Sequence, residues 1–142
     1  MAMLDHVGIG VNDWRKSRDW YVANLGLKVE FEVPNGGDAK LGVAALQGDS
    51  DLTLFVEQVP GGVHPCRCVF TFQVGDVEAE YAWLSALGVK FLKPPQKLYW
   101  GYGAELADLD GHTIRLWDEK SIREGQLRFA SQWQQGAAIC PN

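Results

Sequence analysis

An internal repeat constrains the fold of this chain more than any other feature. Residues 7–31 read VGIGVNDWRKSRDWYVANLGLKVEF, and residues 70–91 read FTFQVGDVEAEYAWLSALGVKF. In each stretch alternating apolar residues lead to an Asp, a helical pattern follows, and the pattern stops at a Gly. The two Asp residues lie 63 positions apart (76 minus 13), and the two Gly residues lie 62 apart (88 minus 26). The match predicts two copies of one structural unit.

Both copies predict a strand followed by a helix. Strict alternation of apolar residues is typical of a strand with one buried face. Asp13 and Asp76 can accept the free amide hydrogens of a first helical turn, and Gly26 and Gly88 can adopt the left-handed conformation that ends a helix. One apolar stripe is expected on each helix, made by Trp14, Tyr21 and Leu25 in the first and by Val77, Tyr81 and Leu84 in the second.

Each copy continues into further extended segments. The first strand is expected over Leu4–Val11, with later extended runs at 28–33, 40–46 and 52–57. The second copy is expected to have strands at 66–74, 90–92, 103–107 and 112–117, with a loop at Pro94-Pro95 and a hairpin turn at Asp110-Gly111. We therefore predict an α+β fold of two tandem βαβββ modules, about residues 3–58 and 66–119, which form a curved mixed sheet around a cleft.

Length and composition limit the remaining possibilities. A chain of 142 residues suits one compact domain, here predicted over 1–119, and residues 120–142 are expected to form a C-terminal extension that packs on the domain or on a dimer partner. The net charge of -5 argues against a nucleic-acid partner. There is no apolar run near 18 residues, no signal-like N-terminus and no framework spacing among three cysteines, so we expect a cytoplasmic protein without a membrane partner.

The strands also predict which side chains share a face. Aliphatic and aromatic residues such as Ile9, Leu52, Leu54 and Ile114 are expected under the helices. The opposite, mixed face is expected to line the cleft. The repeat pairs position 6 with 69 and position 53 with 115, so His6, Thr53, Val69 and Arg115 are expected to converge.

At these residues the chain resembles the vicinal oxygen chelate superfamily, which contains glyoxalase I, extradiol dioxygenases and bleomycin resistance proteins. The resemblance covers about residues 3–119 and rests on LDHVGIGVND, on the S-x-x-W-Y-x-x-x-L-G run from Ser17 to Gly26, on FQVGDVE and on DLDGHTIRLWDE. Leu109 stands where family members usually carry a proline. The resemblance implies paired βαβββ modules around a cleft, commonly in homodimers.

In metal-dependent members of that superfamily, the resemblance implies ligands at positions 6, 53, 69 and 115. This chain keeps only His6, because Thr53, Val69 and Arg115 stand at the other three positions. A guanidinium stays protonated and repels a divalent cation. We therefore predict neither a bound metal nor another cofactor.

The remaining chemistry indicates recognition of a small molecule. Flat aromatic faces combined with a few charged groups are the usual composition of such a site. We predict a metal-free protein that binds and sequesters an aromatic, antibiotic-like ligand, as a resistance protein does. The alternatives are a lyase or dioxygenase, either metal-dependent or acting by acid/base chemistry through Glu57 or Glu105, and a dimeric interaction module with a closed cleft. The predicted ligand-binding residues are His6, Thr53, Phe55, Glu57, Arg67, Val69, Trp100, Tyr102, Glu105, Arg115 and Trp117.

Overall fold

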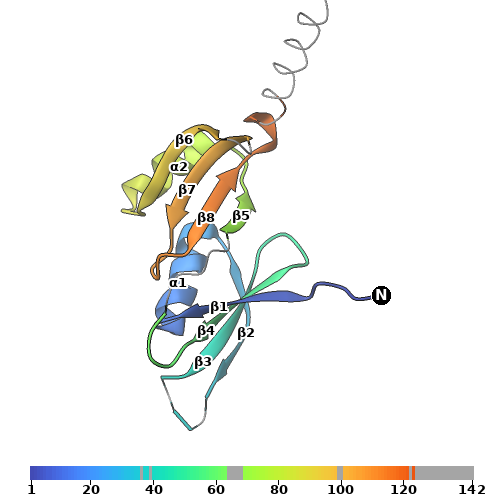
Figure 1. The fold of residues 1–142 in the computed structure, drawn as a ribbon, viewed down its shortest axis with the longest axis vertical. Coiled ribbons are helices and arrows are strands. Elements are labelled where there is room, and N and C mark those ends of the chain that lie inside the picture. Colours follow the sequence, from blue (N-terminus) through green and yellow to red (C-terminus); the bar gives the residue numbers. More distant parts are fainter. Residues whose placement is uncertain (36, 39, 64–68, 99–100, 122, 124–142) are drawn as a thin grey trace, which may run out of the picture. The chain divides into compact units, whose positions relative to one another are not determined.

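The computed structural model describes residues 1–142 except 36, 39, 64–68, 99–100, 122 and 124–142. The chain divides into two compact units, Met1–Cys66 with Asp108–His112 and Arg67–Ala107 with Thr113–Asn142. In the described part of each unit, a four-stranded sheet has a helix packed on it, α1 in the first unit and α2 in the second (Figure 1). The predicted pair of βαβββ modules is thus confirmed.

The first unit contains β1 (His6–Val11), α1 (Trp14–Leu25), β2 (Lys28–Pro34), β3 (Gly42–Gln47) and β4 (Thr53–Gln58). Its strand order is β1-β4-β3-β2, with β1 parallel to β4 and the other neighbours antiparallel. The side chain of Asp13 accepts from the backbone N–H groups of Arg15 and Lys16, and Gly26 ends the helix with a φ of 67°. Both predicted helix boundaries are therefore confirmed.

The second unit repeats this order with β5 (Val69–Gln73), α2 (Val77–Ala86), β6 (Phe91–Leu98), β7 (Gly101–Ala107) and β8 (Thr113–Trp117). The strand order β5-β8-β7-β6 matches that of the first sheet. Asp76 accepts from the backbone N–H of Ala79 at 2.9 Å, and Gly88 follows the helix with a φ of 82°. The second helix begins and ends as the repeat predicts.

Each module also contains an equivalent hydrogen bond that the sequence did not indicate. The first backbone N–H of α1, from Trp14, donates to Oε1 of Gln58 at 2.9 Å, and that of α2, from Val77, donates to Oδ2 of Asp118 at 2.8 Å. Gln58 ends β4 and Asp118 follows β8 directly. In each module, therefore, a side chain at the end of the last strand satisfies a free amide at the start of the helix.

Strand β6 departs from the prediction. A short strand followed by a loop at Pro94-Pro95 was expected, but β6 runs through both prolines to Leu98. A proline lacks the N–H that an interior strand must donate, so it is tolerated only at a sheet edge or a bulge. Strand β6 is the edge of its sheet, and its register with β7 shifts between Lys93 and Gln96. Both conditions are met, and the loop prediction is wrong.

Smaller differences concern the ends of segments. The first strand begins at His6 rather than Leu4, and β3 begins at Gly42 rather than at residue 40. Residues 66–68, where the fifth strand was expected to begin, lie outside the described residues. Leu52 precedes β4 and is 42% exposed, so its predicted place under a helix is wrong. Among the residues that the structure describes, no helix is both long enough and apolar enough to cross a membrane.

The predicted turn at Asp110-Gly111 is a structural element of the first unit. The buried hydroxyl of Tyr21 donates to Oδ2 of Asp108 at 2.7 Å, and Nε2 of the buried His112 donates to the carbonyl of Gly10 at 2.8 Å. The other oxygen of Asp108 accepts from the backbone N–H groups of Asp110 and His112. His112 therefore fixes the turn to β1.

Candidate ligand site on the open sheet faces

Each sheet has one face under its helix and one face that no described helix covers, which we call the open face. On the first sheet Ile9, Val11, Leu54 and Val56 are buried on the helix side. Alternation places His6, Gly8, Phe55 and Glu57 on the open face. On the second sheet Ile114 and Leu116 are fully buried, whereas Thr71, Arg115 and Trp117 retain exposure on the open face. The predicted faces of these strands are confirmed.

The open face of the first sheet carries three aromatic rings. The ring of His6 stacks on that of Phe55, with centroids 4.1 Å apart and planes inclined by 16°. Phe31 of β2 meets Phe55 edge-on at 5.6 Å between centroids. We call these three residues the aromatic cluster. Its outer member, Phe31, is 47% exposed, which leaves flat apolar surface accessible.

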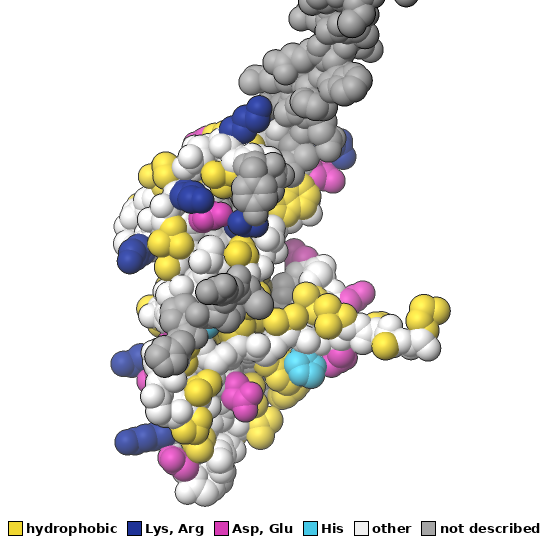
Figure 2. All heavy atoms as spheres, in the orientation of Figure 1, with side chains coloured by type: hydrophobic (Ala, Val, Ile, Leu, Met, Phe, Trp, Pro, Cys, Tyr) yellow, Lys and Arg dark blue, Asp and Glu magenta, His cyan; other side chains and the backbone are white. Residues whose placement is uncertain are grey.

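Oxygen acceptors surround this cluster. The hydroxyl of Thr53 donates to Oε2 of Glu30 at 3.3 Å, and Nδ1 of His6 lies 2.9 Å from Oδ2 of Asp5. Glu57 is exposed and stands opposite Gly10 in the register of β1 and β4. Figure 2 shows a histidine among hydrophobic and acidic side chains on this side of the first unit. The surface therefore combines stacking faces with negative charge.

The open face of the second sheet carries an ion-paired row instead. Nε of Arg115 donates to Oε1 of Glu105 at 3.0 Å, and Nζ of Lys93 lies 3.4 Å from Oε2 of the same carboxylate. Glu105 is only 7% exposed, and a buried charge requires compensation, which two cations from the neighbouring strands supply. We call Lys93, Glu105 and Arg115 the charged row.

Strand register corrects one predicted equivalence. His6 stands opposite Thr53, and its repeat partner Val69 stands opposite Thr113. Thr53 therefore corresponds to Thr113, 60 positions later (113 minus 53), and the predicted pairing of Thr53 with Arg115 is wrong. The spacing of 62 to 63 found at the helices does not persist, because the connections between strands differ in length. The position equivalent to Arg115 is Phe55.

The other predicted site residues are distributed unevenly. Trp117 stands opposite Gly103 on the open face, and Val69 is 36% exposed. Tyr102 lies on the helix side, since its hydroxyl donates to the carboxylate of Glu78 on α2. This bond raises the pKa of Tyr102 to about 12, with smaller contributions from burial and nearby charge. Arg67 and Trp100 lie outside the described residues.

Phe31 belongs to the open face of the first sheet and Lys93 to that of the second, and sequence reasoning missed both. Phe31 lies in an alternating run with Val29 and Val33 that reads as an ordinary apolar strand face. The register places the small Ala45 between Phe31 and Phe55, which leaves room for the two rings to meet across it. A small residue flanked by aromatic positions on neighbouring strands is the signal that a register-based reading would use.

The residues present do not fit the metal centre of metal-dependent relatives. His6 is held by Asp5 and stacked on Phe55, and Arg115 is paired with Glu105. Phe55 and Val69 offer no metal-binding atoms. Within the described part of the chain, no group of three or more His, Cys, Asp or Glu side chains is arranged to hold a metal ion.

The chain folds into two repeated βαβββ modules, each with one open sheet face. This architecture places it in the class of proteins built from paired βαβββ modules. The family model of the Glyoxalase/Bleomycin resistance protein/Dioxygenase superfamily matches residues 3–116. The chain therefore belongs to this superfamily, as the motifs in its sequence suggested.

Individual relatives are distant. The uncharacterized protein YetH of Bacillus subtilis (strain 168) is 24% identical over 117 residues, which is 82% of this chain and 98% of YetH. The antibiotic binding protein TnmS3 from Streptomyces sp. CB03234 superposes with a TM-score of 0.68 at 23% identity, over 83% of this chain and 96% of TnmS3. Leishmania major glyoxalase I also gives 0.68 at 23% identity, over 96% and 99% of the two chains. Both structural matches show a shared fold.

Proposed function

We propose that this protein binds a planar aromatic small molecule on the open face of the first sheet and releases it chemically unchanged. The observation that carries the proposal is the aromatic cluster of His6, Phe55 and Phe31, with Phe31 about half exposed. Offset stacking and edge contacts between rings are worth roughly 0.5–1.5 kcal/mol each beyond the area they bury. A flat heterocycle that contacts Phe31 and Phe55 gains both contributions.

The carboxylates around the cluster support a preference among such ligands. Asp5 contacts His6, Glu30 contacts Thr53, and Glu57 lies on the same strand face as Phe55. Lys28 is a basic residue in the row that contains Thr53. A positively charged substituent on the ligand is therefore stabilised by the carboxylates and by the ring faces together. An antibiotic-like ligand is supported further by TnmS3, a structural neighbour that is described as an antibiotic binding protein.

Binding without turnover is supported by the chemistry of Arg115, which occupies the position equivalent to Phe55 in the second module. Arg115 is part of the charged row, where Glu105 already compensates it. A protonated guanidinium donates hydrogen bonds and cannot act as a general base. The residues at this pair of positions thus favour recognition of a ligand over its activation. The predicted homodimer and cytoplasmic location stay predictions.

A titration of planar heterocycles by calorimetry, with mass spectrometry of each recovered ligand, tests the proposal. We expect saturable binding of cationic members, with weaker binding of neutral and anionic analogues of the same ring system. Phe31→Ala should weaken binding by at least about 1 kcal/mol, which corresponds to roughly fivefold in Kd. The control is Val22→Ala, an exposed apolar residue of α1 on the opposite side of the same sheet. Equal effects of the two substitutions would count against the aromatic cluster.

One observation favours an acid/base enzyme as the second candidate. Oδ2 of Asp5 lies 2.9 Å from Nδ1 of His6, and a carboxylate at this nitrogen fixes the orientation of an imidazole. His6 is then the candidate base, in place of the carboxylates Glu57 and Glu105 considered from sequence. Conversion of a bound ligand that stops in both His6→Gln and Asp5→Asn would select this alternative over sequestration.

A further inference from the structure

The outer face of α2 is apolar, and no described residue of its module covers it. Trp83 is 50% exposed and Leu87, at the end of the helix, is 55% exposed. Ala79, Ala82 and Ala86 are exposed as well. At 3.6 residues per turn these five side chains form one stripe opposite the buried Val77 and Leu84. We call it the outer stripe; it contains no charged residue.

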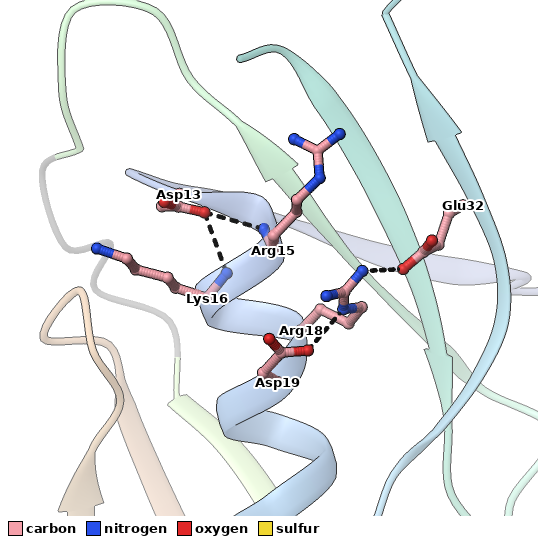
Figure 3. Close-up of polar contacts among 6 residues, drawn as sticks. All are labelled: Asp13, Arg15, Lys16, Arg18, Asp19 and Glu32. Carbon is pink, nitrogen blue, oxygen red and sulfur yellow. Dashed lines mark hydrogen bonds and ion pairs between the residues drawn. The ribbon is translucent and has the colours of Figure 1, made fainter. Parts of the chain in front are cut away.

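The corresponding face of α1 shows what a solvent-facing helix in this fold requires. At the positions equivalent to the outer stripe, 63 residues earlier, α1 carries the exposed Lys16 and Asp19, the half-buried Trp20, Ala23 and Asn24. Beside them Arg18 bonds both to Asp19 at 2.8 Å and to Glu32 of β2 (Figure 3). Both helices are duplicates in the same place on equivalent sheets. The module therefore needs only one apolar helix face. A helix that is apolar on its other side too is usually covered by a partner.

The C-terminal part of the same chain is a candidate to cover the outer stripe. It leaves β8 at Trp117, and Asp118 then accepts from the backbone N–H of Val77 at 2.8 Å and of Ser121 at 2.6 Å. Residues 118–121 are thereby held at the first turn of α2. A further 21 residues follow, numbered 122–142, and their sequence includes Ile122, Leu127, Phe129 and Trp133. We call residues 122–142 the C-terminal segment.

We propose that the C-terminal segment docks on the outer stripe of α2 in the same chain. Helix α2 has 10 residues and is about 15 Å long, a distance that roughly five extended residues span, so the segment is long enough to follow it. Its apolar side chains match a stripe of small alanines beside Trp83 and Leu87.

Hydrogen exchange followed by mass spectrometry on the full chain tests this docking. The measurement is made at a concentration at which sedimentation shows a monomer. We expect amides of the C-terminal segment to exchange about tenfold or more slowly than in a synthetic peptide of residues 122–142. Trp83→Glu should remove this protection. Val22→Glu, the same kind of change at an exposed apolar position of α1, should leave it intact.

Three outcomes overturn the proposal. In the first, the segment of the wild-type chain exchanges as fast as the free peptide. In the second, its protection survives Trp83→Glu. In the third outcome, protection of the segment or of α2 appears only as dimers form, which assigns the outer stripe to a second copy. Because Trp83 is half exposed, its substitution should leave the fold intact, and circular dichroism of the variant checks this.

Discussion

Phe55 and Arg115 occupy the same position in two copies of one sheet. Phe55 stands between Gly8 and Ala45, and Arg115 stands between Thr71 and Glu105. The rings of His6 and Phe31 contact Phe55, whereas Arg115 is paired with the buried carboxylate of Glu105, which Lys93 also contacts. Duplication has thus preserved the backbone position while the chemistry of the two copies has diverged. The proposed ligand site rests on the first copy.

The charged row predicts an asymmetry between its members. Glu105→Gln removes the charge that compensates Arg115 and Lys93, and we expect it to lower the free energy of unfolding by about 1–2 kcal/mol. Lys93 has a half-exposed side chain, so Lys93→Gln should cost less than about 0.5 kcal/mol. Urea denaturation of both variants makes the comparison. Equal losses would mean that Glu105 is stabilised by other groups.

Asp118 predicts a loss of stability in acid. Burial alone would raise its pKa, but hydrogen bonds from the backbone N–H groups of Val77 and Ser121, with the Ser121 hydroxyl and Lys120, outweigh burial and lower it. A carboxylate with a depressed folded pKa stabilises the fold above its unfolded pKa, near 3.8, and this contribution is lost as the pH falls through the folded pKa.

Asp118→Asn is the matched variant for this effect. We expect it to be less stable than the wild type at neutral pH by about 1 kcal/mol, since a charged acceptor at a helix start is replaced by a neutral one. The difference should shrink as the pH falls below about 3.8. Urea midpoints measured across this range would contradict the assignment if the difference stayed constant.

Tyr102 predicts a spectroscopic signature at high pH. Its hydroxyl donates to Glu78, which raises its pKa to about 12. Because the folded pKa lies above the ordinary value near 10, the stabilisation is complete below pH 10 and is lost as the pH rises through 12. The difference between phenolate absorbance titrations of the wild type and Tyr102→Phe isolates this group. Glu78→Gln should return the midpoint toward 10, and an unchanged midpoint would refute the cause.

Substitution by alanine should have different effects on stability at Gly42 and at Gly8. A Cβ at Gly42 would lie 2.8 Å from the ring of Trp14, which is 2% exposed and has no room to move. We expect Gly42→Ala to cost about 1–3 kcal/mol through overpacking. A Cβ at Gly8 meets nothing within 4 Å, so Gly8→Ala should change stability by less than about 0.5 kcal/mol. Thermal unfolding of the two variants tests the pair.

Much of the fold was predictable because its signals are local. Alternation around Ile9 and the capping residues Asp13 and Gly26 depend on neighbours within one or two turns. The repeat then added long-range information, since two copies of one pattern predict one architecture. The prolines of β6 misled the prediction because their tolerance depends on which strand forms the sheet edge, and no local pattern states this.

The amino-acid sequence by itself determined the two modules, their helix boundaries, the alternation that separates buried from open faces, and the place of His6, Phe55 and Arg115 on the open face. Only the tertiary structure decided which of these side chains meet. Cross-strand partners depend on register, and a shift of one residue turns every side chain to the other face. Register in turn depends on loop lengths and bulges. For that reason only the structure shows that Phe31 contacts Phe55 and that Tyr102 bonds to Glu78. It also shows that the position equivalent to Arg115 in the first module is Phe55 rather than Thr53.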